Sequence, residues 1–95
     1  MRPDITKIKR GINPILREHG VVKAAIFGSY ARGEAKKRSD VDILVKFKDT
    51  PSLFSLGGLY NALEKKLGRR VDIVTYGSVN ARLKPFIMRD KIDIL

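Results

Sequence analysis

The chain has 95 residues, 43% of them hydrophobic, and its 20 Lys and Arg residues against 10 Asp and Glu residues give a formal net charge of +10. The absence of cysteine excludes disulfides and thiolate metal sites, and no apolar run approaches the roughly 20 residues of a membrane-spanning helix. We expect one small domain, residues 1–95, in the cytoplasm. The charge favours anionic partners such as nucleotides, nucleic acid or an acidic protein surface, although it also serves solubility alone.

The first third of the chain predicts a helix followed by a strand. Apolar residues at helical spacing run through residues 4–19, Pro3 and Asp4 suit the helix start, and Gly20 suits its end. Small and β-branched apolar residues then dominate residues 21–27, which predicts a buried strand.

A turn and a second strand come next. Gly28 permits a sharp turn, and Ser29 is a suitable N-cap for a short helix over residues 30–35. Residues 36–39 form a basic turn, and residues 41–47 predict the second strand.

Residues 52–67 predict a second long helix, ended by Gly68. Two adjacent glycines, Gly57 and Gly58, interrupt it at a cost of about 2 kcal/mol relative to alanine. Either a close approach of this helix to the sheet or a kink would explain them. The expected apolar stripe consists of Leu53, Leu56, Leu59, Tyr60, Leu63 and Leu67.

The last part of the chain predicts a third strand, a short helix and an apolar tail. The strand covers residues 70–76, and the helix lies within residues 80–90. Its start is late, because Pro85 fits only an early helical position or a kink. The tail, residues 92–95, either packs on the sheet or offers contact to a partner.

The turn at Gly28 and Ser29 is a candidate phosphate site. Glycine allows close approach of the backbone to a ligand, and a helix start offers free N–H groups. The Ser29 hydroxyl adds a donor, and Arg32 lies within the first turn of the helix, in reach of the same anion. Taken alone, however, a Gly-Ser pair is far more typical of an ordinary turn from a strand to a helix with a serine cap, because short motifs match by chance.

Three aspartates within apolar strands are candidate metal ligands. Asp40 and Asp42 are two residues apart on one predicted strand, so both side chains point to the same face, and Asp72 lies on the next strand. Three close carboxylates repel one another unless cations bind, and Mg²⁺ prefers oxygen ligands. Two such ions can clamp the attacking and leaving oxygens of an in-line displacement.

Each aspartate also has an ordinary explanation. Asp40 could close the turn at Ser39, Asp42 could be an exposed residue of an edge strand, and Asp72 could pair with the arginines at 69–70. Aspartate is nevertheless depleted in strands, so three such positions together favour a site.

With the turn and the three acids in place, the chain resembles the minimal nucleotidyltransferases of the DNA polymerase beta superfamily. The signature of this family is Gly-Ser, ten residues, Asp-x-Asp and a later Asp on an adjacent strand. The residues here that match the family are Gly28, Ser29, Arg32, Gly33, Glu34, Ser39, Asp40, Asp42, Leu56, Gly57, Gly58, Leu59, Gly68, Val71, Asp72, Ile73 and Val74.

The resemblance implies an α/β fold with a small mixed sheet flanked by helices, and transfer of AMP from ATP to a hydroxyl. It implies that Asp40 and Asp42 bind two Mg²⁺ ions, and that Asp72 completes the ion near the attacking hydroxyl. Gly28 and Ser29 would hold the β and γ phosphates. Short members of the family act as antitoxins that modify a tyrosine of a HEPN-type toxin, so such a toxin is the expected partner.

Three further hypotheses follow from the same sequence. A catalytically inactive antitoxin could neutralise its partner by contact alone, through residues 92–95 and the stripe between Leu53 and Leu67. The charge of +10 makes nucleic-acid binding a further alternative. It is less favoured, because the seven aromatic residues form no evident stacking platform. Acceptor recognition by so short a chain requires a protein partner or a homo-oligomer.

Overall fold

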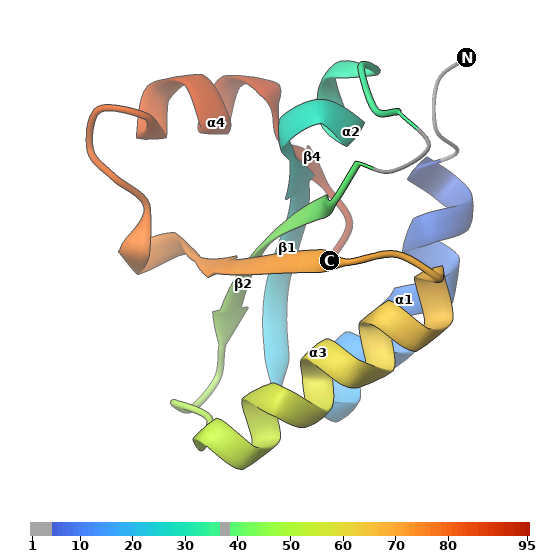
Figure 1. Cartoon of the computed structure of the whole chain (residues 1–95). Coiled ribbons are helices and arrows are strands. Elements are labelled where there is room, and N and C mark those ends of the chain that lie inside the picture. The colour runs from blue at the N-terminus through green and yellow to red at the C-terminus, as the bar shows by residue number, and fades with distance from the viewer. Residues whose placement is uncertain (1–4, 37–38) are drawn as a thin grey trace.

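The computed structural model describes residues 5–36 and 39–95 and contains one mixed four-stranded sheet (Figure 1). Its strands are β1 (Val21–Phe27), β2 (Val41–Phe47), β3 (Val71–Thr75) and β4 (Ile92–Asp93), in the order β3-β2-β1-β4. β2 and β3 are parallel, whereas β1 is antiparallel to both of its neighbours. The predicted fold class is therefore confirmed. Pro3, Asp4, Lys37 and Arg38, for which the sequence predicted a helix start and a basic turn, lie outside the described residues.

Four α-helices accompany the sheet within the described part of the chain. α1 (Ile5–Glu18) and α3 (Leu53–Leu67) lie side by side on one face, while α2 (Gly28–Arg32) and α4 (Lys84–Asp90) contact each other near the end of β1 (Figure 1). A 3₁₀ turn, η1 (Tyr76–Ser78), follows β3. None of these helices is long and apolar enough to cross a membrane.

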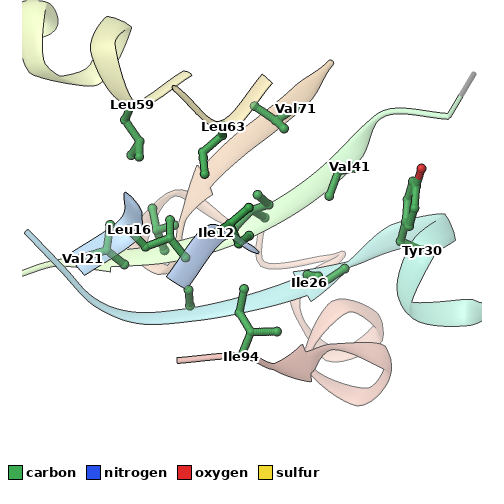
Figure 2. Packing of buried hydrophobic residues seen from close by; sticks show 13 residues of the cluster. Ile12, Leu16, Val21, Ile26, Tyr30, Val41, Leu59, Leu63, Val71 and Ile94 are labelled. Atoms are coloured by element: carbon green, nitrogen blue, oxygen red, sulfur yellow. The ribbon is translucent and has the colours of Figure 1, made fainter. Parts of the chain in front are cut away.

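The core lies between α1, α3 and one face of the sheet (Figure 2). Ile12 and Leu16 of α1 and Leu59 and Leu63 of α3 are fully buried, as expected for residues four apart on one helix face. The stripe predicted for α3 was wrong at its start, since Leu53 is 88% exposed. The buried stripe begins later because the first turn of α3 extends beyond the sheet. The other members of the core cluster are Val21, Ala24, Ile26, Tyr30, Val41, Ile43, Val45, Val71 and Ile94.

The two adjacent glycines of α3 do not mediate an approach to the sheet. A Cβ atom at Gly57 would meet nothing within 4 Å, and one at Gly58 would lie 3.8 Å from Nε2 of His19. Among the described residues, an added Cβ atom at this pair would thus meet only His19, the residue after α1, and α3 continues through both glycines.

The C-terminal tail packs on the sheet. Ile92 pairs with Ile26 in β1, the Ile94 side chain is 2% exposed, and the N–H group of Leu95 donates to the carbonyl of Ala24. Of the two predicted alternatives for residues 92–95, packing on the sheet is correct. Pro85 lies in the first turn of α4, which confirms the late start of that helix.

Side chains of α3 cover the outer edge of β3. The hydroxyl of Tyr60 accepts from the N–H group of Ile73 at 3.2 Å and donates to its carbonyl oxygen at 3.3 Å. One turn later, the carboxylate of Glu64 accepts from the N–H group of Val71 at 3.0 Å. These bonds satisfy backbone groups that an edge strand would otherwise leave open, and they hold β3 in place beside β2.

We expect the Tyr60→Phe substitution to lower the free energy of unfolding by about 1–2 kcal/mol, because it leaves the N–H group of Ile73 without its partner. Urea denaturation and amide hydrogen exchange at Ile73 measure this loss. Tyr76→Phe is the matched control. The buried hydroxyl of Tyr76 has no hydrogen-bond partner among the described residues, so its removal should cost nothing. Equal losses for the two variants would contradict the role of Tyr60.

Candidate active site

The carboxylate of Asp42 lies against the backbone of the turn at Gly28. Phe27, the last residue of β1, is paired with Asp42 in β2, and the chain then turns at Gly28 with φ = 71°. A Cβ atom at Gly28 would lie 2.2 Å from Oδ2 of Asp42, so a side chain there would force Asp42 or the turn to shift. The sequence predicted that this glycine admits a ligand, and the structure adds that it admits a carboxylate of the chain itself.

Asp42 and Asp72 lie next to each other in the parallel pair of strands. They are register partners, and residues opposite each other on neighbouring strands are about 4.8 Å apart. Asp42 is half-buried on an interior strand, so the edge-strand alternative for this residue is wrong. Asp72 is exposed, and the ion pairs found among the described residues do not involve it. The convergence of these two acids is thus as predicted.

Asp40 precedes the strand rather than lying on it. β2 begins at Val41, and Asp40 is exposed. The turn before it is closed by Ser39, whose hydroxyl accepts from the N–H group of Lys36 at 2.7 Å and whose N–H group donates to the Lys36 carbonyl at 3.0 Å. Asp40 is therefore not needed to close this turn.

The acids influence one another electrostatically at Asp42. The pKa of Asp42 lies above its ordinary value, chiefly because burial disfavours the charged carboxylate, and then because the charges of Asp72 and Asp40 repel it. Arg32 acts in the opposite direction and lowers the pKa of Asp42. The four side chains thus belong to one electrostatic cluster.

The chemistry of this cluster fits a hard divalent cation. Its donors are all carboxylate oxygens, which Mg²⁺ prefers, and a cation would relieve the repulsion that raises the pKa of Asp42. Across residues 5–36 and 39–95, no three His, Cys, Asp or Glu side chains are already spaced as ligands of one ion. An ion bound by all three acids would therefore have to draw their carboxylates closer together.

The turn itself differs from the prediction. α2 begins at Gly28 and has five residues, so Ser29 is its second residue and not its N-cap. Phe27 occupies the cap position, and no side chain caps the helix. The last helical residue is Arg32 and not residue 35. Gly33, which follows with φ = 72°, adopts a left-handed conformation that ends the helix. The first-turn N–H groups at Gly28 and Ser29 lack a side-chain cap, as a phosphate site requires.

Arg32 lies beside the acids and is partly engaged by its own loop. Its Nε atom is 3.2 Å from the carboxylate of Glu34, and both side chains are substantially exposed. A surface pair of this kind contributes little to stability, so Arg32 can exchange Glu34 for an incoming phosphate at small cost.

Sequence reasoning missed the contribution of α4 to this region. A pocket of about 210 Å³ lies directly beside the turn, between α2 and α4. It depends on a contact between segments more than 50 residues apart, which no local pattern reveals. Its lining residues are Phe27, Gly28, Arg32, Leu83, Phe86, Ile87 and Asp90.

Comparison with known proteins places this chain in a family. The family model described as "Nucleotidyltransferase domain" matches residues 9–94. The chain therefore belongs to the nucleotidyltransferases, and it is a minimal member of that family related to MntA.

Three similar proteins illustrate the relationship. The chain is 50% identical to "Putative protein adenylyltransferase MJ0435" of Methanocaldococcus jannaschii over 97% of this chain and 99% of the relative. It is 46% identical to "Protein adenylyltransferase MntA" of Thermococcus cleftensis over 81% and 79% of the two chains. A solved structure titled "Crystal structure of the toxin-antitoxin with AMP-PNP" matches with a TM-score of 0.78 and 26% identity, over 92% of this chain and 72% of that one.

Proposed function

We propose that this protein transfers AMP from ATP to a hydroxyl group of a partner toxin and thereby acts as an antitoxin. The observation that carries the proposal is the placement of Asp42, which Gly28 admits at the turn and which is the register partner of Asp72. Two curated relatives are named protein adenylyltransferases, and one solved structure of the same fold is a toxin–antitoxin with a nucleotide analogue.

The proposed roles follow from the position of each side chain. Asp40 and Asp42 would hold two Mg²⁺ ions, and Asp72 would complete the site nearest the acceptor. Mg²⁺, when bound, neutralises charge on the phosphates and favours an in-line displacement. The first-turn N–H groups at Gly28 and Ser29, together with the Ser29 hydroxyl, would donate to the β and γ phosphates.

The reaction balances with ATP, the acceptor hydroxyl of the partner and residues of this chain. Asp72, the exposed acid, would take the proton of the acceptor hydroxyl, whose oxygen then bonds to the α-phosphorus of ATP. The bond from that phosphorus to the bridging oxygen breaks, and pyrophosphate leaves. Arg32 would attract the departing charge, because it already lies close enough to Asp42 to lower the pKa of that residue.

A HEPN-type toxin with a reactive tyrosine is the proposed acceptor. The resemblance to short antitoxins of this family supports it, and so does a second structural match, titled with the toxin–antitoxin MntA-HpeT, at 26% identity and a TM-score of 0.72. An antitoxin that acts by contact alone is less favoured, because Ile94, Leu59 and Leu63, which would belong to its contact surface, are buried in the core.

Transfer of label from α-labelled ATP to the product of the neighbouring gene, in the presence of Mg²⁺, tests the proposal. Wild type should label the toxin and neutralise it, and an Asp40→Asn/Asp42→Asn variant should do neither. The control variant Glu18→Gln/Asp49→Asn changes the charge equally at exposed positions and should behave as wild type. Full neutralisation by the Asp40/Asp42 variant would instead establish an antitoxin that works by binding alone.

A further inference from the structure

The pocket between α2 and α4 has an apolar wall that ends in a carboxylate. Leu83, Ile87 and Asp90 follow one another at intervals of four and three residues, so they share one face of α4, the helix that contacts α2 (Figure 1). Phe86 lies beside them and also lines the pocket. Leu83 and Phe86 are nevertheless half-exposed, so much of this wall is open to a ligand.

The carboxylate end of this wall lies beside the turn at Gly28. β1 and β4 run antiparallel with Ile26 opposite Ile92, and continuation of this register by two residues brings Asp90 to the level of Gly28. Phe86 is four residues before Asp90, about 6 Å further along the axis of α4. A ligand that begins at the turn therefore meets Asp90 first and the apolar wall next.

The fold gives little reason for a carboxylate at Asp90. Its ion pair among the described residues is with the mostly exposed side chain of Arg89 at 3.4 Å, and such a surface pair contributes little to stability. Asp90 is also the last residue of α4, where a negative charge opposes the helix dipole. It is not among the charges that shift the pKa of Asp42, so it stands apart from the candidate metal ligands.

We propose that this pocket holds the nucleoside part of ATP, with the 2′ and 3′ hydroxyls of the ribose donating to the carboxylate of Asp90. Two neighbouring hydroxyls suit the two oxygens of one carboxylate, and hydrogen bonds to a charged acceptor are stronger than neutral ones. The inference rests on the proposed function, because that function places the phosphates at Gly28 and Ser29. It adds a choice of substrate class, namely ribonucleoside over deoxyribonucleoside triphosphates.

The base stacks on the apolar wall beyond Asp90. In a nucleotide the ribose lies between the phosphates and the base, just as Asp90 lies between Gly28 and Phe86. The guanidinium carbon of Arg89 is 5.5 Å from the ring centroid of Phe86, and this cation–π contact helps to hold the ring in place. Every base has a flat π face, so stacking on Phe86 favours no particular base, and selection falls on the sugar.

Nucleotide binding in Mg²⁺ without the toxin, measured by calorimetry, tests the role of Asp90. Wild type should bind ATP at least about tenfold more tightly than 2′,3′-dideoxyATP, because the analogue lacks both donors. Asp90→Ala should bind the two nucleotides within about twofold of each other, since its methyl group accepts no hydrogen bond. Asp49→Ala, at an exposed position, is the matched control and should discriminate as wild type does. The ratio of the two affinities within one variant does not depend on how much of it is folded.

Phe86→Ala tests the stacking wall in the same assay. It should weaken the binding of ATP and of 2′,3′-dideoxyATP alike, by about tenfold, because both nucleotides lose the same stacking contact. Phe54→Ala removes an almost fully exposed ring at the start of α3 and should bind both nucleotides as wild type does. Weaker labelling of the toxin by Phe86→Ala, with unchanged affinity for ATP, would mean that the pocket receives the acceptor, and the inference would be wrong.

Two further outcomes would overturn the role of Asp90. One is equal affinity of wild type for ATP and 2′,3′-dideoxyATP. The other is weaker binding of inosine triphosphate, which lacks the amino group of adenine, if Asp90→Ala removes that difference, because Asp90 would then contact the base. Discrimination against the dideoxy analogue by wild type, without any label on the toxin, would instead refute the proposed transfer and support the nucleoside site.

Discussion

We expect replacement of Asp42 by Asn to abolish the proposed AMP transfer and, at the same time, to stabilise the metal-free protein. The loss in rate should be at least on the order of 10²–10³-fold, because the substitution removes a charge that the proposed reaction needs. The gain in stability follows from the raised pKa of Asp42, since burial and two neighbouring acids disfavour its ionised form in the folded state. Functional groups held against repulsion commonly cost stability in this way.

The pH dependence follows from the same shift. The folded state binds a proton at Asp42 more tightly than the unfolded state does, so stability falls as the pH rises from the ordinary pKa of aspartate through the raised one. Above the raised pKa the wild-type protein carries the full cost, and the Asn variant does not. Its Tm should therefore be higher on the order of a few degrees, as measured by calorimetry in EDTA.

Addition of Mg²⁺ should reverse the order of the two proteins. An ion that binds only the folded state raises the Tm of wild type by linkage, whereas the Asn variant, which lacks a proposed ligand, should respond weakly. Asp49→Asn, at an exposed position, is the control for loss of one negative charge. A lower Tm of Asp42→Asn in EDTA would mean that the carboxylate has a structural role and would contradict this interpretation.

The Gly28→Ala substitution should damage both stability and activity. Its backbone has φ = 71°, which costs an alanine about 1 kcal/mol, and the new methyl group would lie 2.2 Å from Oδ2 of Asp42. Relief of that overlap has to move Asp42 or the turn, which adds about 1–3 kcal/mol. Because each kcal/mol lowers the Tm of so small a domain by about 4–8 °C, thermal unfolding shows the effect clearly.

Gly68→Ala separates the two contributions. Gly68 has φ = 66°, but a Cβ atom there would meet nothing within 4 Å, so this variant is destabilised only by the strained backbone conformation. The double variant Gly28→Ala/Asp42→Ala removes the overlapping carboxylate and should recover the difference between Gly28→Ala and Gly68→Ala. Equal destabilisation by Gly28→Ala and Gly68→Ala would show that Asp42 moves aside freely, and that Gly28 does not position it.

Much of the site could be predicted because its determinants are local. Runs of apolar residues predicted β1 and β2 with the bounds that the structure has, and the polar interruptions of β2 and β3 marked Asp42 and Asp72. Their register required only that β3 lies beside β2, and α3 provides the crossover that a parallel pair needs.

The errors arose where tertiary contacts override local preference. Ser29 is a good N-cap by residue type, but the tight turn that accommodates Asp42 makes Gly28 the first helical residue. Leu53 has the helical spacing of the core stripe, yet no other element covers the first turn of α3. The close approach of the Lys66 side chain to Gly11 also joins two helices, and the sequence of neither helix reveals it.

The hydrogen bonds of Tyr60 and Glu64 along β3 have a consequence for assembly. They occupy backbone donors at one margin of the sheet, and the other margin ends in β4, only two residues long. Neither margin is a good template for a strand from another molecule, which protects the chain against fibril-like stacking. We therefore expect a protein that reaches Asp42 and Asp72 to engage side chains rather than to extend the sheet. Recognition then depends on the chemistry of that surface and not on shared backbone pairing.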